Sequence, residues 1–400
     1  MKQIEVAVIG GGLAGMIAAF ALARGGRSVA LVAPPHNKAD KRTTALMDQS
    51  IRFLERLTLW DKIAPSTAAL TTMRIIDGTS RLLRAPTVSF RSSEIGLEAF
   101  GYNIPNAVLL DTLGRAIEAE GNIAHIEATA SEITFRDDGV TIALDNGQSI
   151  EAAFVVGSDG RNSMVRETLG IKVKGWSYPQ SAMVLNFAHS LPHQNISTEF
   201  HTESGPFTQV PLPGSRSSLV WVQKPAEAAT NADKSLEELG RLVEERMQSM
   251  LGQVTIEDNV QVWALSGMTA HRFGRGRAAL IGEAAHVFPP IGAQGLNLSL
   301  RDILALSDIL CSRPDQPIPA SAGDIFDRRR RADVISRTTS VDLLNRSLLS
   351  DFLPVQMLRA AGLHVLSALA PLRNLVMREG IEPGGALGNF SSKLREKLRR

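Results

Sequence analysis

The sequence predicts an α/β protein with α+β elements, in which a Rossmann-like lobe is interrupted by a mostly antiparallel sheet and followed by a helical tail. Three observations support this fold class. Apart from Glu5, Ile4–Ile9 is apolar, as in a strand buried on both faces, and a glycine-rich turn and the Ala- and Leu-rich segment Leu13–Arg24 follow it. Between about Ser181 and Leu265, short alternating segments replace this pattern. From Leu296 onward the sequence is mainly helical.

Periodicity and turn residues predict the remaining elements. Helices are expected at Thr44–Leu59, Leu109–Glu120 and Leu236–Leu251. Strands outside the inserted sheet are expected at Ser28–Val32, Met73–Ile76, Thr87–Phe90, Ile126–Phe135, Val140–Leu144, Ser149–Val156 and Ala278–Ile281. Strands of the inserted sheet are expected at Ala182–Phe187, Ser197–Thr202, Phe207–Pro211, Ser218–Gln223 and Val260–Ala264.

Composition indicates a globular protein with more than one lobe. The chain has 400 residues, of which 44% are hydrophobic and 21% charged, and it is too long for one small core. Its net charge of +2 does not favour nucleic acid as the main partner. With one cysteine and no Cys/His cluster, we expect no internal disulfide and no metal site. The sequence shows no signal-peptide pattern and no long apolar run, so we expect a cytoplasmic protein without a transmembrane helix.

The first motif is Gly10-x-Gly12-x-x-Gly15, between a predicted strand and a predicted helix. Gly10 permits a tight turn, Gly12 lets the backbone approach a pyrophosphate, and Gly15 allows the helix to pack closely on the strand. The free N–H groups of the helix then face the phosphates. A purely structural glycine turn is the alternative, but the strand–turn–helix context favours nucleotide binding.

One expected partner of that motif is absent. An Asp or Glu usually ends the second strand, about 20 residues further on, and binds a ribose hydroxyl. Here the position is Ala33, followed by Pro34 and Pro35. Because a charge-assisted hydrogen bond contributes about 1.5–3 kcal/mol, we expect the nucleotide to be held more weakly than it would be with the acid.

The second motif is a glycine turn at the end of another predicted strand. Asp159 and Gly160 lie where the strand ends and a helix begins. The aspartate can cap that helix and accept hydrogen bonds from a sugar or an amide, and Arg166 is its expected ion-pair partner. An Asp-Gly pair alone is usually only a turn, so the interpretation depends on the other motifs.

A third glycine turn follows Ala278–Ile281. Gly282 starts it, and the Glu283 carboxylate suits a polyol chain because it accepts hydrogen bonds. The stretch Gly292–Asn297 offers N–H groups at a helix start, which suit an electron-rich ring. His286 is interpreted as packing behind the turn, and the run Arg328–Arg331 as a solvated helix face.

Together these motifs resemble those of the aromatic hydroxylases of the flavoprotein monooxygenase superfamily, over about residues 4–375. Within it, the chain is most similar to the ubiquinone-biosynthesis hydroxylase family. The segments that carry this similarity are Arg42–Leu46, Gly101–Asn106, Pro192-His193, Phe200, Gly205-Pro206, Pro211–Pro213, Ser218–Trp221 and Gly362–Arg373.

This resemblance implies an FAD-binding domain of the p-hydroxybenzoate hydroxylase type at residues 1–75, 100–175 and 266–330. It implies a substrate-binding sheet at 76–99 and 176–265 and a helical region at 331–400. The implied FAD-binding residues are Gly10, Gly12, Leu13, Ala14, Gly15, Arg42, Asp159, Gly160, Gly282, Glu283, Pro290, Gly292, Ala293, Gln294, Gly295, Leu296 and Asn297. The family usually has Asp at the position of Glu283, and Pro289-Pro290 is closer to p-hydroxybenzoate hydroxylase.

The resemblance further implies an FAD-dependent monooxygenase that uses NADH or NADPH and O₂ through a hydroperoxyflavin. Its expected substrate is a polyprenyl-phenol intermediate of ubiquinone biosynthesis. The flavin carries the chemistry, so no catalytic residue is assigned. A phenol would benefit from a base, and His193, His201 and His271 are candidates by lobe only, since each is more often an ordinary histidine.

Two alternatives stay open. A hydroxylase of a small soluble aromatic acid is favoured by Pro289-Pro290 and opposed by the apolar tail. A non-catalytic flavoprotein subunit of a quinone-synthesis assembly is suggested by Ala33 and Glu283. The apolar segment Asp351–Val376 is expected to pack on the body, and the alternatives are an exit for a prenyl chain or peripheral contact with the inner membrane. Association with other quinone-synthesis enzymes also stays open.

Overall fold

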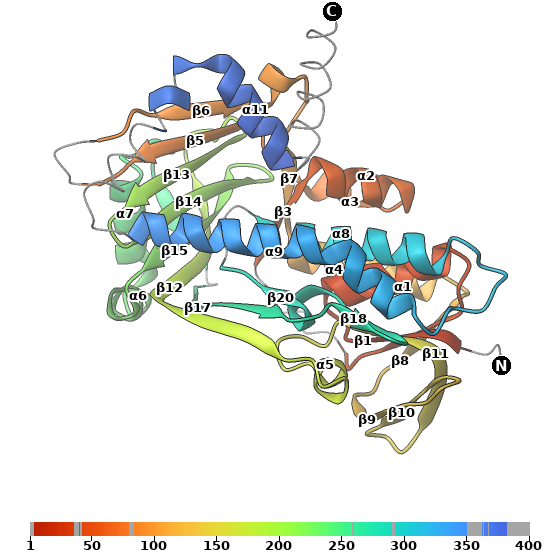
Figure 1. Cartoon of the computed structure of the whole chain (residues 1–400). Coiled ribbons are helices and arrows are strands. Elements are labelled where there is room, and N and C mark those ends of the chain that lie inside the picture. The colour runs from red at the N-terminus through yellow and green to blue at the C-terminus, as the bar shows by residue number, and fades with distance from the viewer. Residues whose placement is uncertain are drawn as a thin grey trace, which may run out of the picture.

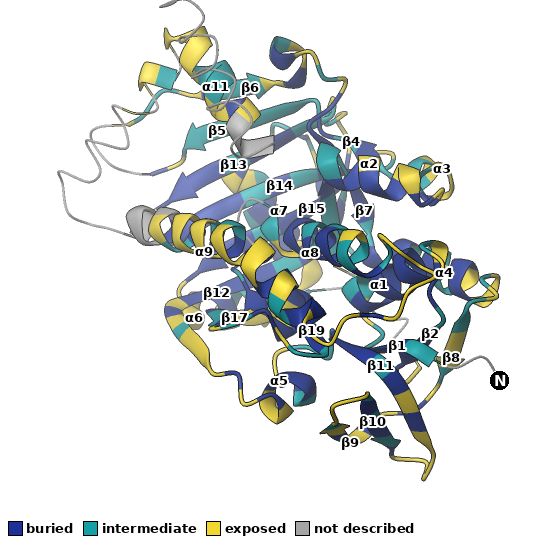
Figure 2. Ribbon diagram, turned by 45° about the vertical axis from the view of Figure 1, so that its right-hand side comes forward, coloured by how far each residue is buried: buried dark blue, intermediate teal, exposed yellow. Residues whose placement is uncertain are grey.

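The computed structural model confirms the predicted fold class. It describes residues 4–35, 40, 42–79, 84–257, 260–289, 293–349, 362, 364–366 and 368–381. Two large sheets lie at the two ends of the molecule, and the long helix α9 (Ala322–Leu349) runs from one toward the other (Figure 1). One side of α9 is exposed and the other is buried (Figure 2).

The first sheet has the order β18-β19-β11-β1-β2-β8, with the β9–β10 hairpin attached to β11. From β19 to β8 its neighbouring strands are parallel, as expected for strands joined by helical crossovers. Its strands are β1 (Ile4–Ile9), β2 (Val29–Val32), β8 (Ile123–Ile126), β9 (Ala130–Phe135), β10 (Val140–Leu144), β11 (Ser149–Gly157), β18 (Gly274–Arg275) and β19 (Ala278–Leu280).

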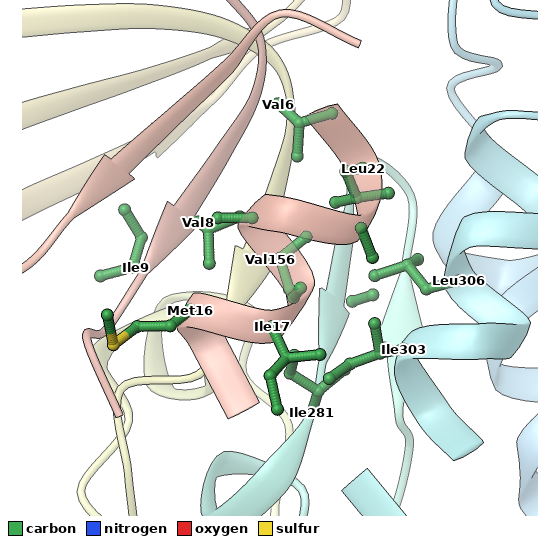
Figure 3. Packing of buried hydrophobic residues seen from close by; sticks show 14 of the residues in the cluster. Val6, Val8, Ile9, Met16, Ile17, Leu22, Val156, Ile281, Ile303 and Leu306 are labelled. Carbon is green, nitrogen blue, oxygen red and sulfur yellow. The ribbon is translucent and has the colours of Figure 1, made fainter. Parts of the chain in front are cut away.

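Helices cover this sheet and bury its apolar strands. Helix α1 (Leu13–Arg24) begins and ends as predicted, and it packs against α4 (Asn106–Glu118) and α8 (Gln294–Leu310). Ile17 on α1, Ile281 after β19 and Ile303 on α8 meet in one close-packed cluster (Figure 3). Because α1 is apolar on all sides, it can be buried between the sheet and the neighbouring helices α4 and α8.

The second sheet has nine strands in the described part of the chain, in the order β20-β17-β12-β15-β14-β13-β5-β6, with β16 beside β12. All its pairs are antiparallel except β5 with β13. Its strands are β5 (Thr72–Asp77), β6 (Val88–Arg91), β12 (Val173–His189), β13 (Ile196–Thr202), β14 (Gly205–Leu212), β15 (Arg216–Gln223), β16 (Val254–Ile256), β17 (Gln261–Ala270) and β20 (His286–Val287).

Short elements fill the space around the two sheets. A small sheet joins β3 (Thr43–Met47), β7 (Gly101–Pro105) and β4 (Ala68–Ala69). In the described part of the chain, the remaining helices are α2 (Asp48–Arg56), α3 (Trp60–Ile63), α5 (Met164–Thr168), α6 (Pro225–Ala232), α7 (Leu236–Arg246) and α11 (Ala370–Ile381), with 3₁₀ turns η1 (Ala64–Ser66), η2 (Ser92–Ile95) and η3 (Gly282–Ala284). No helix among the described residues is long and apolar enough to cross a membrane.

The structure corrects two predictions of local structure and adds one helix. The expected helix Thr44–Leu59 is wrong in its first part, because Thr43–Met47 pairs with β7 as a strand and the helix begins at Asp48. The expected strand Ile126–Phe135 is two strands, β8 and β9, which belong to different parts of the sheet. Helix α6 was not predicted. At Thr43–Met47, pairing with the distant strand β7 overrides the local helical pattern.

Candidate functional site

The three glycine turns meet at one edge of the parallel sheet, which we name the glycine edge. Its turns are Gly10–Gly15, Gly157–Gly160 and Gly282–Ala284. Ile9 of β1 pairs with Gly157 of β11, and Gly157 pairs with Leu280 of β19, so the carboxyl ends of the three strands are level. In open α/β sheets, ligands bind in the crevice outside these ends. The sequence motifs that the turns carry are therefore brought together as predicted.

Glycine is required in this edge by close backbone contacts. Gly10 has a φ of +116°, and a side chain there would collide with the carbonyl group of Ser158 in the second turn. A side chain at Gly15 would collide with the carbonyl of Gly10. These two glycines are needed for packing within the protein.

Gly12 has a different environment. No described atom lies within 4 Å of the position that its side chain would occupy. Gly12 is also the N-cap residue of α1, and no side chain caps this helix end within the described part of the chain. The N–H groups that begin α1 are therefore uncapped beside an open position at Gly12, as a pyrophosphate site requires.

The Asp159 carboxylate is only partly used by the protein. Its Oδ2 accepts a hydrogen bond from the Val165 N–H at 3.2 Å, whereas its Oδ1 is buried without a hydrogen-bond partner among the described residues. The predicted ion pair with Arg166 is wrong. Arg166 donates instead to the carbonyl oxygens of Ala284 and Arg161, which ties the second turn to the third. A buried acceptor of this kind needs a donor from a ligand or from water.

The two other charged residues of the predicted site are already in ion pairs. Glu283 pairs with Arg161 at 2.9 Å, and both side chains are about half exposed, 52% and 53%. Arg42 pairs with Asp40 at 2.8 Å. Burial alone would raise the pKa of Asp40, but hydrogen bonds from Arg42 and Asn106 outweigh it and hold that pKa below its ordinary value.

The N-terminus of α8 is held by the side chain of Asn297. Its amide donates to the carbonyl oxygens of Ala45 (2.7 Å) and Ala293 (2.6 Å), and its Oδ1 accepts from the Met47 N–H (2.9 Å). Ala293 has a φ of +53°, which is rare for a residue with a side chain. Asn297 therefore fixes this helix end against β3, and the N–H groups that begin α8 have no side-chain cap in the described residues. The predicted residues Pro290 and Gly292 lie outside the described residues.

The residues present fit FAD. The edge combines open space over Gly12, uncapped helix N-termini at α1 and α8, and the unsatisfied Oδ1 of Asp159. The end of β2 supplies no acid, because Ala33 is buried against Gly11. The arrangement can bind phosphates through the backbone and a sugar or amide through a carboxylate.

Two adjacent rows of side chains, on opposite faces of the nine-stranded sheet, differ in burial. The pairs Met183–Trp221, Trp221–Phe207 and Phe207–Phe200 place four large side chains in a row, and all four are buried in the cluster that includes α7 residues. A second row lies one residue along each strand and therefore on the opposite face, since successive side chains of a strand alternate between faces. It consists of the pairs Val184–Val220, Val220–Thr208 and Thr208–Glu199, because directly paired residues share a face. All four residues of this second row are only half buried.

The half-buried row lies on the side of the sheet that contacts the small β3–β7 sheet. In the neighbouring row Ser218 accepts a hydrogen bond from the Thr43 hydroxyl at 3.0 Å, and the Asn103 amide donates to the carbonyl of Pro211 at 2.9 Å. β3 is in turn held to the start of α8 by Asn297. We name the residues Val184, Glu199, Thr208 and Val220 the inner row.

Of the three candidate histidines, only His201 has a carboxylate as partner. Its Nε2 lies 2.8 Å from Glu199, whose other oxygen accepts from the Thr208 hydroxyl at 3.2 Å. Both ring nitrogens of His193 are engaged by backbone groups of Leu212 and Asn195. His271 is exposed after β17. Sequence reasoning missed Glu199, although its place one residue before the buried Phe200 on an alternating strand was the signal.

Comparison with known proteins agrees with this arrangement. The family model described as "FAD binding domain" matches residues 3–314. Ubiquinone hydroxylase UbiL of Rhodospirillum rubrum is 33% identical over 95% of this chain and 90% of the relative. 3-Demethoxyubiquinol 3-hydroxylase of Escherichia coli is 28% identical over 94% and 98% of the two chains. The structure of p-nitrophenol 4-monooxygenase PnpA from Pseudomonas putida superposes with a TM-score of 0.78 at 21% identity, covering 97% and 99%, and supports the fold.

A glycine edge of this kind, joined to a large antiparallel sheet, is the fold that this chain shares with p-nitrophenol 4-monooxygenase PnpA. The chain belongs to the FAD binding domain family and is an FAD-dependent aromatic hydroxylase. Its cofactor is FAD, with NADH or NADPH as the electron donor that is typical of the family and O₂ as co-substrate.

Proposed function

We propose that the protein hydroxylates the ring of a polyprenyl-phenol intermediate of ubiquinone biosynthesis. The observation that carries this proposal is that relatives named as ubiquinone hydroxylases match over nine-tenths or more of both chains, so the match includes the large sheet as well as the nucleotide lobe. The inner row supports it, because its valines offer an apolar surface for an aromatic ring.

The FAD-binding residues of this proposal divide by the part of FAD that they would hold. Gly12, Leu13 and Ala14 would hold the pyrophosphate at α1, in the turn that Gly10 and Gly15 shape, and Asp159, Gly160, Gly282 and Glu283 would hold the linking polyol. Arg42, Pro290, Gly292, Ala293, Gln294, Gly295, Leu296 and Asn297 would surround the ring system near α8. When bound, FAD supplies the redox chemistry and the activation of O₂.

The protein's own contribution on the substrate side is a proton acceptor, which we assign to Glu199. A phenol has a pKa near 10, so removing its proton makes the ring more electron-rich and needs a base close to the hydroxyl. Glu199 is half buried, and His201 and Thr208 fix both of its oxygens. The residue is therefore oriented before substrate binds.

This role can be tested by replacing Glu199 with Gln and measuring kcat as a function of pH. Loss of a positioned base lowers kcat by about 10²–10⁴-fold. Because the phenol ionises by itself at high pH, the deficit should shrink as the pH rises. Thr208→Val removes one hydrogen bond to the carboxylate and should have a smaller effect of the same kind. A deficit that is constant with pH would contradict the assignment.

Contact with a membrane surface is a further part of this proposal. Val365, Leu369, Leu372 and Val376 are exposed apolar residues, and the last two lie on one side of α11 because they are four residues apart. Met377 of the same helix is buried against Ile95 and Phe100. The test is flotation of the FAD-loaded protein with anionic vesicles. Replacing both Leu369 and Leu372 with Glu should abolish binding to the vesicles. The ion pair between Arg373 and Glu94 is left unchanged in this variant.

The overall proposal is tested by mass spectrometry of quinone lipids from cells that lack the protein. The expected result is accumulation of a polyprenyl precursor that is short of one ring oxygen, and the wild-type gene but not the Gly12→Val variant should reverse it. Unchanged quinone lipids, in cells without a second such hydroxylase, would contradict the proposal. Coupled turnover of the purified enzyme on a prenyl-free aromatic acid would then favour the soluble substrate. If a precursor does accumulate, rescue by a variant that binds no FAD would favour the non-catalytic subunit.

A further inference from the structure

A buried chain of ionic groups begins behind the third glycine turn. His286 on β20 and Asp302 on α8 are 1% and 2% exposed, and the imidazole Nε2 lies 2.6 Å from the carboxylate. The other oxygen of Asp302 accepts from Arg330 Nε at 2.7 Å, and Arg330 is also buried. The prediction that Arg328–Arg331 is a solvated face is therefore wrong for Arg330, and His286 has an ionic partner.

The chain continues along α9 toward the start of α8. Arg330 donates to Asp333 at 2.6 Å, and Asp333 also lies 3.2 Å from both Arg301 and Arg337. Arg337 in turn donates to the side-chain oxygen of Gln294 at 2.9 Å. Gln294 is the first residue of α8, so the chain of contacts ends at the helix terminus that we propose binds the flavin ring system.

The charges of this chain do not cancel. Six residues form this chain, and we call them the α8–α9 ion cluster: His286, Arg301, Asp302, Arg330, Asp333 and Arg337. Three guanidinium groups face two carboxylates, so the cluster carries a net charge of +1 when the imidazole is neutral. One buried nitrogen of Arg301 and one of Arg330 have no hydrogen-bond partner among the described residues.

The environment of Arg301 reflects this excess of positive charge. Burial, together with repulsion from Arg337 and Arg330, outweighs the attraction of the two carboxylates and lowers the pKa of Arg301 to about 10. Asp333 responds in the opposite direction. Burial alone would raise its pKa, but the surrounding guanidinium groups hold it below the ordinary value.

We propose that the α8–α9 ion cluster supplies excess positive charge behind the N-terminus of α8 and thereby raises the reduction potential of FAD bound there. This inference rests on the proposed placement of the flavin ring system at that helix end. Reduction adds electrons to the ring, and fixed positive charge in a poorly solvated region stabilises the more negative form. Arg337 is a positioning residue, because it acts through Gln294 and through its charge.

The test is an anaerobic redox titration of the FAD-loaded protein without substrate. Arg337→Gln removes one positive charge from the cluster, and Asp333→Asn removes one negative charge. We expect Arg337→Gln to lower the ratio of affinities for reduced and oxidised FAD about tenfold, which corresponds to a potential about 30 mV more negative. Asp333→Asn should shift the potential in the opposite direction.

Arg329→Gln is the matched control. Arg329 lies on the same helix, and its replacement by Gln changes the net charge by the same amount. Its side chain, however, is exposed and pairs with Asp308. The reduction potential of FAD bound to the Arg329→Gln variant should equal that of FAD bound to the wild type. Arg337→Lys retains the charge and loses the two-point contact with Asp333 and Gln294, so it separates charge from positioning. A lysine variant with the wild-type potential would assign the effect to charge.

Two results would overturn the proposal. Shifts of the same sign in Arg337→Gln and Asp333→Asn would mean that the cluster only holds α8 and α9 together. A shift in Arg329→Gln as large as that in Arg337→Gln would mean that net charge, and not the cluster, sets the potential. Because no substrate is present, the outcome is independent of whether the protein hydroxylates a quinone precursor.

Discussion

The glycine edge and the inner row use different parts of the chain to make a binding surface. At the glycine edge the backbone forms the site, and the charged side chains Glu283 and Arg42 are already in ion pairs. On the sheet, side chains from separate strands form the inner row. Short motifs of small residues therefore reveal the first surface, whereas the second becomes visible only when the register of the strands is known.

The strongest test of this comparison separates Gly12 from Gly15. A side chain at Gly12 meets no described protein atom, so Gly12→Val should leave the apoprotein folded and fill the space proposed for the pyrophosphate. A side chain at Gly15 collides with the backbone of Gly10, so Gly15→Val should destabilise the apoprotein itself. FAD binding, measured by flavin fluorescence, should be lost in both.

Thermal unfolding of the apoproteins provides the control for this pair. Only Gly15→Val should lower the Tm of the apoprotein. If Gly12→Val lowers it equally, both glycines serve packing, and the distinction between an open position and a closed one fails.

The two faces of the large sheet can be compared in the same way with two tryptophans. Trp221 is buried and lies under the Arg246 guanidinium, 4.8 Å from the ring centroid, whereas Trp263 is 53% exposed on β17. Trp221→Ala should cost about 3–5 kcal/mol of the free energy of unfolding. Trp263→Ala should change it by less than about 0.5 kcal/mol. Equal losses in urea denaturation would show that the exposed tryptophan is also structural.

The sequence predicts local features such as the glycine edge well, and it does not predict features such as the inner row that depend on contacts between distant segments. Helix α1 is predicted to the residue and the three turns converge as expected, because buried strands and glycine turns are local patterns. The strand Thr43–Met47 was missed because pairing with β7 decides its conformation. The predicted capping role of Asp159 agrees with its hydrogen bond from Val165, which is a local contact. The ion pair of Arg330 with Asp302 was missed because only the fold brings α9 beside α8.

A smaller effect is expected where the glycine edge lacks its usual side chain. Ala33→Asp would restore an acceptor for a ribose hydroxyl at the end of β2 and should tighten FAD binding by about 1.5–3 kcal/mol. Ala33→Asn, which has the same shape without the charge, is the control and should gain less. An unchanged Kd for FAD in isothermal titration would mean that other contacts of the edge already satisfy the nucleotide.

The smallest effect concerns the ion pair across the edge, and it tests whether side chains there act for the protein or for FAD. Because Arg161 and Glu283 are both half exposed, their pair should contribute less than about 1 kcal/mol to folding, and Arg161→Gln should barely change the Tm of the apoprotein. If Glu283 serves FAD, Glu283→Gln should weaken FAD binding while Arg161→Gln leaves the Kd unchanged or lowers it, because the carboxylate is released from its partner. Equal weakening in both variants would instead make the pair itself the binding element, and the edge would then depend on side chains in the way that the inner row does.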